Sequence, residues 1–350
     1  MSKFYTFDEI CKRKDINGKK PLIYIVSTNR SGGKTTAFLK KAFEDNIEYG
    51  EECVLFYRKR TELVGSEKIF EEMIEREYPG QTVTGKMMID NLIYRIWRED
   101  ENGKSPLGFS VAFKGHDDLK KYSPVFPKVT KCLLDEFQKE DGRYLKDECS
   151  VLLSAYTSIA RGQGRQIRPV ELYLLGNNIS ILNPYYFQFG ITKRLKKDTK
   201  FMRGDGWVLE QGFNESASKA LGENAVIRAL SGERELNYLL STEYLIDVDK
   251  FITRPSGRSR YICTIIYDDI KIGVREFDNG EIHCNDKIDP SSLYTFAFTD
   301  SSHSNDTVIL KKGSFLWKTI RDGYEGAYLT FSSHEVKNVI FELIGVDMYK

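Results

Sequence analysis

The stretch that most constrains this chain runs from Leu22 to Phe43 and reads LIYIVSTNRSGGKTTAFLKKAF. It begins with an apolar, β-branched run and continues through a polar turn that carries two glycines. It ends in a segment where the apolar pair Phe38/Leu39 recurs four residues later as Ala42/Phe43. The first pattern is typical of a buried strand and the last of an amphipathic helix. The sequence therefore predicts strand, loop and helix in immediate succession.

The loop of this unit fits a phosphate-binding pattern. From Thr28 to Thr35 it follows the P-loop frame G-x-x-x-x-G-K-[ST] in all but the first position, where Thr28 replaces glycine. Glycines let backbone N–H groups turn toward a phosphate, and the next helix directs its positive dipole end there. In this frame Lys34 reaches the β- and γ-phosphates of ATP, and Thr35 gives its hydroxyl to Mg²⁺. The predicted nucleotide-binding residues are Arg30, Ser31, Gly32, Gly33, Lys34, Thr35 and Thr36. The alternative is an ordinary β–α turn with a surface lysine.

Composition limits the class of protein. A chain of 350 residues can bury a substantial core, and this length predicts two domains. The net charge is only +1, so a nucleic-acid partner would be met by local basic clusters and not by the overall field. The six cysteines are scattered without a C-x-x-C pair, which is typical of small core residues in a reducing compartment. No apolar run reaches membrane-spanning length and the N-terminus lacks a signal pattern, so we expect a soluble, intracellular protein.

A second strand follows the P-loop helix. The continuous apolar run Cys53 to Tyr57 completes a βαβ unit whose strands are covered on both faces. It ends at Arg58-Lys59-Arg60, which is either a solvated strand end or a basic group near phosphate, because ligands bind at strand carboxyl ends in open α/β sheets. The sequence leaves these two interpretations open. Further on, Leu92 to Trp97 and Gly108 to Phe113 predict a peripheral hairpin.

The second chemical motif is the run Val129 to Phe137, in which an apolar strand ends in two consecutive acids. This matches the Walker B pattern. Asp135 would order the Mg²⁺ shell, and Glu136 would orient or deprotonate the water that attacks the γ-phosphate. The alternative is an exposed strand end without a catalytic role.

Two polar segments follow Walker B. A helix predicted over Asp147 to Ile159 runs into a glycine-bearing loop with the arginines Arg161, Arg165 and Arg168. Such a loop favours an anionic partner and suits an arginine finger delivered to the γ-phosphate of a neighbouring subunit. The next predicted strand, Val170 to Leu175, ends in Gly176-Asn177-Asn178. Amides at that tip would sense the γ-phosphate, and the alternative is an Asx turn.

The composition shifts at Arg203-Gly204-Asp205-Gly206. Beyond it the sequence predicts helices over Asn214 to Leu230 and Glu233 to Leu240, which would form a hinge or lid. The C-terminal part predicts a three-stranded meander, a further strand and a last helix opened by the capping box Ser332/Glu335; the strands are Tyr261 to Tyr267, Ile270 to Phe277, Glu281 to Cys284 and Leu293 to Phe298. The predicted domains are 1–205 (P-loop ATPase), 206–245 (helical linker or lid) and 246–350 (C-terminal domain).

Taken together, these motifs resemble the DNA-packaging (encapsidation) ATPase of phi29-like tailed phages and, more distantly, phage large terminases. The likeness rests on Arg30 inside the P-loop, the Walker B run, the loop from Arg161, and Gly176-Asn177-Asn178 followed by Asn183-Pro184-Tyr185. The resemblance implies an α/β fold: an additional-strand (ASCE) P-loop ATPase domain with a mostly parallel sheet, and a C-terminal α+β domain similar to a vestigial RNase H fold. It also implies that Arg161 acts in trans.

The resemblance further implies a DNA translocase that packages viral genome. ATP and Mg²⁺ would be its cofactors. Its partners would be double-stranded DNA, the phage portal and prohead, and copies of itself in a ring, a pentamer by resemblance; whether a structural RNA takes part stays open. It would act in the host cytoplasm, assembled transiently on the prohead vertex, with no membrane partner. The candidate DNA or interface residues are Lys139, Lys120, Lys121, Arg165 and Arg168.

Three rival functions can be weighed from residues. A terminase with an active nuclease would need a carboxylate in the middle of the first meander strand to hold a metal ion, but that centre reads Ile262-Cys263-Thr264-Ile265. A small-molecule P-loop kinase is disfavoured by Glu136. A nucleotide-binding DNA or capsid module without turnover is supported only by Thr28. We therefore expect ATP hydrolysis and no metal-dependent nuclease activity.

Overall fold

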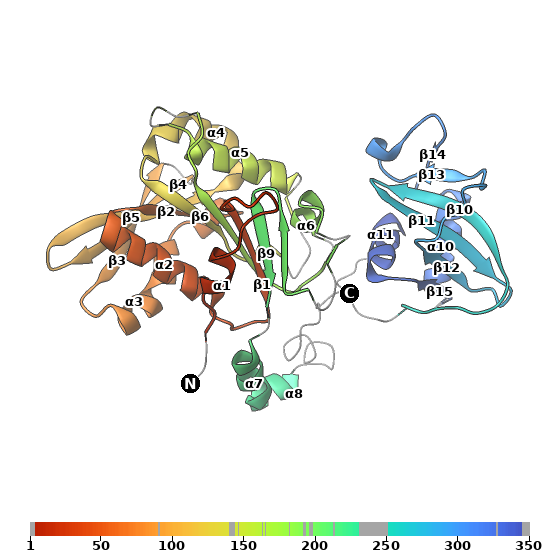
Figure 1. Cartoon of the computed structure of the whole chain (residues 1–350), viewed down its shortest axis with the longest axis horizontal. Helices are drawn as coiled ribbons and strands as arrows, with labels where there is room; N and C mark the ends of the chain where they lie inside the picture. The colour runs from red at the N-terminus through yellow and green to blue at the C-terminus, as the bar shows by residue number, and fades with distance from the viewer. Residues whose placement is uncertain are drawn as a thin grey trace. The chain divides into compact units, whose positions relative to one another are not determined.

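The computed structural model divides into two compact units, Met1–Leu245 and Ile246–Lys350, each with its own sheet (Figure 1). The residues that the structure describes are 4–89, 92–139, 144–145, 147–162, 164, 166–181, 183–191, 194–195, 199–212, 214–230, 251–326 and 328–344.

The N-terminal unit is built on a nine-stranded sheet in the order β3-β4-β5-β2-β6-β7-β1-β9-β8. The strands are β1 (Ile23–Thr28), β2 (Glu52–Tyr57), β3 (Thr82–Ile89), β4 (Ile93–Asp100), β5 (Gly103–Ala112), β6 (Val129–Leu134), β7 (Glu171–Asn177), β8 (Phe201–Gly204) and β9 (Trp207–Gln211). The six strands from β5 to β9 in this order are parallel, while β3, β4 and β8 pair antiparallel. Strand β7 lies between the P-loop strand β1 and the Walker B strand β6, which is the additional-strand arrangement that the resemblance implied.

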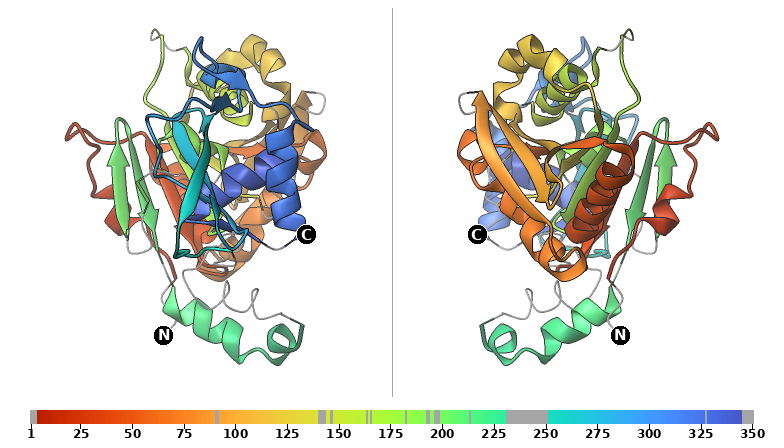
Figure 2. Two further views of the ribbon diagram at one scale, coloured as in Figure 1. Left: turned by 90° about the vertical axis from the view of Figure 1, so that its right-hand side faces the viewer. Right: turned by 90° about the vertical axis from the view of Figure 1, so that its left-hand side faces the viewer.

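Helices cover both faces of this sheet, as Figures 1 and 2 show. The α-helices are α1 (Asp8–Cys11), α2 (Lys34–Tyr49), α3 (Glu71–Glu77), α4 (His116–Leu119), α5 (Glu148–Ala160), α6 (Pro184–Gln188), α7 (Glu215–Glu223) and α8 (Ala225–Leu230). The 3₁₀ turns are η1 (Arg60–Glu62), η2 (Ser66–Phe70), η3 (Phe113–Gly115) and η4 (Lys120–Val125). Helix α2 packs on one face with Tyr24 and Val26, and α5 on the other with Ile25. Alternate residues of β1 thus enter opposite core layers, which is why the strand is continuously apolar.

The edges of the sheet were predicted less completely. The hairpin is confirmed as β4 and β5, and β3 extends it, in orange in the right-hand view of Figure 2. The turn 203–206, predicted as a domain boundary, instead joins β8 to β9, and Trp207 of β9 pairs with Ile23 of β1. The ATPase sheet therefore continues to Gln211. The helix predicted over 214–230 forms as α7 and α8, and the one over 233–240 lies outside the described residues.

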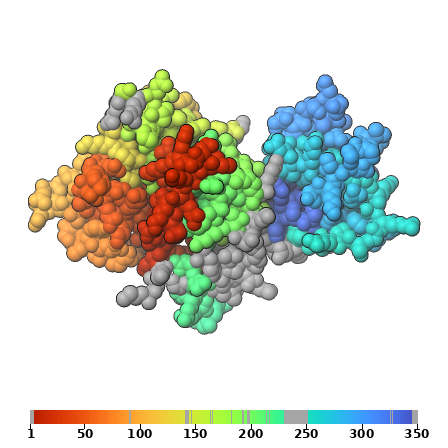
Figure 3. All heavy atoms as spheres, viewed as in Figure 1, coloured from red at the N-terminus to blue at the C-terminus, as the bar shows by residue number. Residues whose placement is uncertain are grey.

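The N-terminal segment lies along β8, the edge strand at the opposite end of the sheet from β3. Ile16 N donates to Gly204 O (3.1 Å), and the Arg13 guanidinium lies 4.1 Å from the centre of the Phe201 ring. On the face seen in Figure 3, the red atoms of this segment lie against the green atoms of β8 and β9. The segment therefore covers an edge that would otherwise be open to pairing with another strand.

The C-terminal unit has a six-stranded sheet in the order β14-β13-β10-β11-β12-β15. Its elements are β10 (Ser259–Tyr267), β11 (Ile270–Phe277), β12 (Ile282–Asn285), β13 (Thr295–Ala297), η5 (Asp300–Ser302), β14 (Val308–Ile309), α10 (Phe315–Glu325), β15 (Leu329–Phe331) and α11 (His334–Ile344). The meander β10–β12 is antiparallel, and β13 and β14 continue parallel to β10. This is the strand order of an RNase H-like sheet, as predicted, with β15 added beside β12.

The start of α11 corrects one prediction. The hydroxyl that accepts a hydrogen bond from the first turn belongs to Ser333, which accepts from Val336 N at 3.3 Å. The Ser332 hydroxyl is buried without a partner among the described residues. The helix therefore begins one residue later than the predicted capping box, because Ser332 is still part of the extended chain leaving β15 and its N–H donates to Cys284 O. Among the residues described, no helix has the length and apolarity needed to cross a membrane.

Candidate active site

The P-loop joins β1 to α2 at the carboxyl edge of the sheet. Gly33 caps α2 with φ = 85°, a left-handed conformation that favours glycine. A Cβ on Gly33 would lie 3.1 Å from the ring of Phe4, so the backbone here is also closely covered. Arg30 and Ser31 are exposed and Thr36 is half-buried on the first turn of α2. The glycine turn leads directly into the N-terminus of α2, an arrangement suited to presenting N–H groups to an anion.

Lys34 is the buried cation of this loop. Its side chain is 6% exposed, and Nζ donates to Thr28 Oγ1 (2.9 Å), Asn29 O (3.3 Å) and Asn177 Oδ1 (3.0 Å). Burial lowers the pKa of Lys34 to about 8, although the nearby Asp135 carboxylate opposes this shift. Thr28, the residue that departs from the P-loop frame, thus supplies a hydroxyl to the lysine.

Thr35 and Asp135 meet across the space between the P-loop and Walker B. Thr35 Oγ1 donates to Asp135 Oδ2 at 2.6 Å. Burial raises the pKa of Asp135, while the hydrogen bond from Thr35 acts in the opposite direction. A hydroxyl and a carboxylate that converge in this way offer the hard oxygen ligands that Mg²⁺ prefers, so the residues fit this ion.

Glu136 follows Asp135 with its side chain exposed. Its backbone has φ = 50°, which is unusual for a residue with a Cβ, and its N–H donates to Asp135 Oδ1 at 2.9 Å. A pocket of about 260 Å³ opens at this point, between the ends of β2 and β6. Asp135, Glu136 and Lys139 line it together with Tyr57 and Glu62. The predicted catalytic acid therefore borders open space, as a group that must reach a water molecule requires.

Arg58 is not the solvated strand end that the sequence left open, because its side chain is only 11% exposed, and it lines the same pocket as Glu136. It lies at the end of β2, where Nη1 donates to Glu136 O (3.1 Å) and Nη2 donates to Phe137 O (3.1 Å) and to Glu148 Oε1 (2.8 Å). Glu148, the first residue of α5, also accepts from Tyr185 Oη at 2.6 Å. Sequence reasoning missed Glu148 and gave Tyr185 no role beyond its place in the Asn183-Pro184-Tyr185 likeness, because a helix-start acid and a buried tyrosine resemble surface and core residues.

Gln138 holds the Walker B turn from the other side. It is buried, and Nε2 donates to Ser27 Oγ at 3.1 Å. Its Oε1 accepts from the backbone N–H groups of Ile179 and Ser180, both at 3.1 Å. One amide thus joins the ends of β1, β6 and β7. No sequence pattern indicates this role, since a single glutamine after Asp-Glu-Phe has no distinctive spacing.

The two asparagines at the tip of β7 form hydrogen bonds with different residues. Asn177 Oδ1 accepts from Lys34 and so belongs to the nucleotide site. Asn178 is buried, and its Oδ1 accepts from Ser27 Oγ at 2.6 Å. Of the pair predicted as sensors, only Asn177 contacts the P-loop lysine.

The P-loop is also joined to α7. Asn29 Oδ1 accepts from Asn214 N at 2.8 Å, and Asn29 Nδ2 donates to Asn214 O at 3.1 Å. Asn214 in turn caps α7, accepting from Ala217 N at 2.9 Å. The helical segment predicted as a hinge or lid therefore begins at a residue fixed by the P-loop itself.

The arginine loop lies elsewhere. Arg161 follows the last residue of α5 and is exposed. Helix α5 begins beside Walker B, where Glu148 pairs with Arg58, and ends near Val129 at the start of β6. Arg161 is therefore at the amino edge of the sheet, opposite the P-loop of its own chain. Arg165 lies outside the described residues.

Arg168 has an internal role that differs from the predicted one. It is 8% exposed, and its guanidinium donates to four backbone carbonyls, those of Phe126, Pro127, Val129 and Ile159, at 2.7–3.3 Å. Burial lowers its pKa from the usual value. These contacts join α5 to the segment before β6, so we do not retain Arg168 as a candidate for DNA contact.

The predicted surface lysines remain accessible. Lys120 pairs with Asp117 at 2.8 Å and Lys121 with Asp118 at 3.6 Å. Exposed pairs of this kind contribute little and can exchange for a phosphate. Lys139 lines the pocket beside Glu136.

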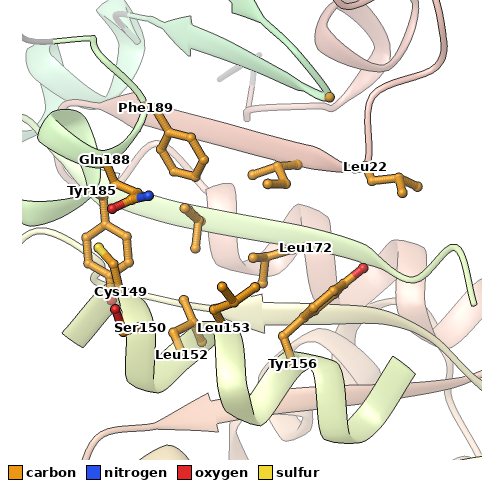
Figure 4. A pocket seen from close by; sticks show the side chains of 13 residues that line it. Leu22, Cys149, Ser150, Leu152, Leu153, Tyr156, Leu172, Tyr185, Gln188 and Phe189 are labelled. Atoms are coloured by element: carbon orange, nitrogen blue, oxygen red, sulfur yellow. The ribbon is translucent and has the colours of Figure 1, made fainter. Parts of the chain in front are cut away.

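A second pocket is apolar and shares no lining residue with the pocket beside Glu136. It has a volume of about 350 Å³ and lies between α5, α6 and the strands β1 and β7. Figure 4 shows Leu152, Leu153 and Tyr156 on one wall and Phe189 and Leu22 on the other. No charged side chain lines it, so it is unsuited to phosphate.

The described part of the C-terminal unit, 251–326 and 328–344, contains no counterpart of the nucleotide site. The centre of β10 carries Cys263 and Thr264, and Asp268 lies in the turn after this strand with φ = 49°. Its carboxylate accepts from Thr299 and Ser301 hydroxyls at 3.0 and 2.7 Å. Within the described ranges, no three His, Cys, Asp or Glu side chains gather as a metal site. The absence of nuclease activity stays a prediction.

The fold and the site define a P-loop ATPase of the additional-strand class. Comparison with known proteins gives the family. Residues 4–348 match the podovirus DNA encapsidation protein (Gp16) family, and the chain belongs to it. The resemblance stated from the sequence is thereby confirmed, and the chain is a DNA-packaging ATPase of the phi29-like kind.

Individual relatives match most of the chain. The DNA packaging protein of Bacillus phage phi29 is 23% identical over 319 residues, which cover 90% of this chain and 90% of that protein. The DNA packaging protein of Bacillus phage B103 is 23% identical over 331 residues, covering 92% and 94%. Among solved structures, the bacteriophage phi29 viral genome packaging motor assembly contains a chain with the same fold, with a TM-score of 0.67, 20% identity and 99% coverage of both chains.

Proposed function

We propose that this chain is one subunit of a homo-oligomeric ring that hydrolyses ATP at subunit boundaries and moves double-stranded DNA into a prohead. The observation that carries this proposal is the position of Arg161. It is exposed at the amino edge of the sheet, while Lys34, Thr35, Asp135 and Glu136 gather at the carboxyl edge. An arginine on the far edge is too distant for its own nucleotide, but it is free to enter a neighbour's site.

Each site residue has a distinct task in the reaction. Lys34 exchanges its internal partners for the β- and γ-phosphates of ATP. Thr35 and Asp135 would hold Mg²⁺, which supplies positive charge against the phosphate oxygens. Glu136 accepts a proton from the attacking water or orients it. Arg161 of the neighbouring subunit stabilises the charge that develops on the γ-phosphate.

Loss of the γ-phosphate would change the hydrogen bonding of Asn177. While ATP is bound, Lys34 is drawn away from the Asn177 amide; after phosphate release the 3.0 Å hydrogen bond between them can form again. Asn178 contributes indirectly, because it holds Ser27 just before the P-loop.

DNA would be gripped through its phosphates. Lys139 borders the Walker B pocket, and Lys120, Lys121 and Arg165 are further candidates. Contacts to phosphate position the duplex without reading its bases, so any genome sequence can be moved. Such binding weakens steeply as salt rises.

The family supports the proposed assembly. The phi29 relative with the same fold is part of a viral genome packaging motor assembly. By the same reasoning this chain would assemble, in the host cytoplasm, as a pentameric ring on the portal vertex of a prohead.

The test is steady-state ATP hydrolysis with and without double-stranded DNA, for the wild-type chain and for wild type mixed with Arg161→Ala. We expect turnover to rise with DNA, and a minority of mutant subunits to lower it more than in proportion. Glu136→Gln should reduce turnover to background. DNA-independent turnover that averages simply across the mixture would contradict a shared site and favour a nucleotide-binding module or a kinase.

A further inference from the structure

Arg58 is held at the back of the Walker B turn by contacts that involve all three of its nitrogens. Nη1 donates to Glu136 O and Nη2 to Phe137 O, both at 3.1 Å, while Nε and Nη2 donate to the Glu148 carboxylate at 2.8–3.2 Å. The guanidinium therefore grips the backbone of the catalytic acid and of the residue after it. Arg58 forms no hydrogen bond or ion pair with the Glu136 side chain and so acts on it through the backbone.

The backbone of Glu136 needs such support. Its φ of 50° lies in the left-handed region, which is unfavourable for a residue with a Cβ and persists only where neighbouring groups hold it. Two contacts fix the turn on the side of β1 and β7: Phe137 N donates to Leu175 O at 3.0 Å, and Gln138 bonds to Ser27. Arg58 holds it from the side of β2. The direction in which the Glu136 side chain leaves the turn is thus set between these two sides.

The partner of Arg58 is itself fixed. The Glu148 side chain is fully buried, and besides Arg58 it accepts from Tyr185 Oη at 2.6 Å and from Leu145 N at 2.8 Å. A buried carboxylate with this many donors has a single orientation, and the fork of Arg58 matches it with two hydrogen bonds. Lysine cannot reproduce this geometry, because it carries one compact ammonium in place of the planar fork.

We propose that Arg58 is a positioning residue for ATP hydrolysis: through the Glu136 and Phe137 carbonyls it sets the direction of the Glu136 carboxylate. This inference rests on the proposed role of Glu136. It differs from a contact between Arg58 and nucleotide or DNA phosphate, which would alter binding and not the chemical step.

The chain offers a matched control for a test. Arg95 forms a similar two-point pair with Glu52, at 2.8 and 3.0 Å, and its side chain is 13% exposed against 11% for Arg58. The Arg95 pair lies at the amino end of β2, away from Walker B. Arg58→Lys and Arg95→Lys thus disturb equivalent ion pairs in one sheet, and only the first touches the catalytic turn.

The experiment measures kcat and KM for ATP with saturating double-stranded DNA, together with the affinities for ADP and for ADP with aluminium fluoride. For Arg58→Lys we expect kcat to fall about 10- to 100-fold, because displacing a general base by a fraction of an ångström forfeits much of its effect. KM and ADP affinity should stay within about twofold, while affinity for ADP with aluminium fluoride falls. Arg95→Lys should retain wild-type kcat.

Other results would overturn the inference. A raised KM or weakened DNA affinity in Arg58→Lys, with kcat retained, would make Arg58 a phosphate contact. Equal losses of kcat in both lysine variants would indicate a general structural effect. If Glu136→Gln loses turnover but Arg58→Lys keeps the wild-type kcat, the positioning role of Arg58 is wrong and the role of Glu136 stands. Turnover retained by Glu136→Gln would instead remove the proposed role of Glu136, and this inference with it.

A milder variant keeps the test decisive if Arg58→Lys does not fold. Tyr185→Phe removes one hydrogen bond from Glu148 without changing the shape of the core. We expect it to lower kcat about threefold with KM unchanged, because the lost hydrogen bond acts on Glu136 only indirectly, through Glu148 and Arg58. Unchanged kcat in this variant would contradict the inference.

Discussion

Lys34 and Asn177 are joined by a 3.0 Å hydrogen bond in which the P-loop ammonium donates to the amide oxygen at the tip of β7. Their strands are adjacent, since Thr28 of β1 pairs with Asn177 itself. A nucleotide phosphate that takes the ammonium therefore competes directly with Asn177. The next residue, Asn178, is engaged with Ser27 and takes no part in this competition.

This difference predicts that alanine substitutions at the two neighbouring positions affect different properties, turnover at Asn177 and stability at Asn178. Asn177→Ala should lower DNA-stimulated kcat about 10-fold with little change in thermal stability, because it removes only the contact to Lys34. Asn178→Ala should lower the free energy of unfolding by about 1–2 kcal/mol, because it leaves the buried Ser27 hydroxyl without its acceptor. Denaturant unfolding and steady-state turnover, measured on both variants, check this. Identical profiles for the two would contradict the distinct roles.

The lowered pKa of Lys34 predicts a pH dependence of nucleotide binding. The free protein holds this pKa at about 8 by burial, and bound phosphate would raise it. ADP should therefore bind with its full affinity below about pH 8, where Lys34 is already protonated in the free protein. Above this pH, binding requires Lys34 to take up a proton, so the affinity for ADP should fall until the pH reaches the higher pKa of Lys34 in the complex. Calorimetric titration of ADP near pH 7 and pH 9, in buffers of different ionisation enthalpy, measures the uptake. Uptake that is absent at pH 9 would contradict the assignment.

Arg168 should matter for stability and not for DNA. Arg168→Ala would leave four backbone carbonyls without their cationic donor, at a cost of roughly 2–5 kcal/mol in the free energy of unfolding. Chemical denaturation measures this loss. Arg168→Lys should recover part of it. DNA affinity of the folded fraction should be unchanged, and a selective loss of DNA affinity would return Arg168 to the candidate DNA contacts.

The Asn29–Asn214 pair predicts that nucleotide binding and the order of α7 are linked. Asn29→Ala removes both hydrogen bonds to the Asn214 backbone, so we expect faster amide exchange in α7 and weaker ADP affinity. Asn224→Ala is the control, since Asn224 caps α8 through Val226 N and Ile227 N and touches no P-loop residue among those described. It should loosen α8 alone. Equal ADP affinities in the two variants would argue against the link.

Much of the nucleotide site could be predicted because its residues recur at fixed spacings. The P-loop, the Walker B acids and the strand tip at Asn177 follow apolar runs, and parallel strands bring their carboxyl ends to one edge. The roles of Arg58, Gln138 and Glu148 could not be predicted. Their contacts with Glu148, Ser27 and Tyr185 span 90, 111 and 37 positions of sequence, respectively, and such pairings depend on strand order, which a local pattern does not determine.

The misplaced domain boundary and the misjudged Arg168 have a common physical cause. The turn at 203–206 resembles a linker in composition, yet β9 completes the sheet beside β1 because its residues are buried. Arg168 resembles its exposed neighbours, yet its side chain fills a gap between carbonyls of three segments. In both cases tertiary packing overrides the local signal.

Helix α5 has a consequence for the order of events in a ring of the proposed kind. Its 13 residues span about 20 Å, with Glu148 pinned to Arg58 at one end and Arg161 following the other. A displacement of the Walker B turn would tilt this rod and so change how Arg161 is presented to the adjacent subunit. Hydrolysis in successive subunits would then need no signal through DNA or portal, because the orientation of α5 in each subunit would depend on the state of its own nucleotide site and would affect the site of the next subunit.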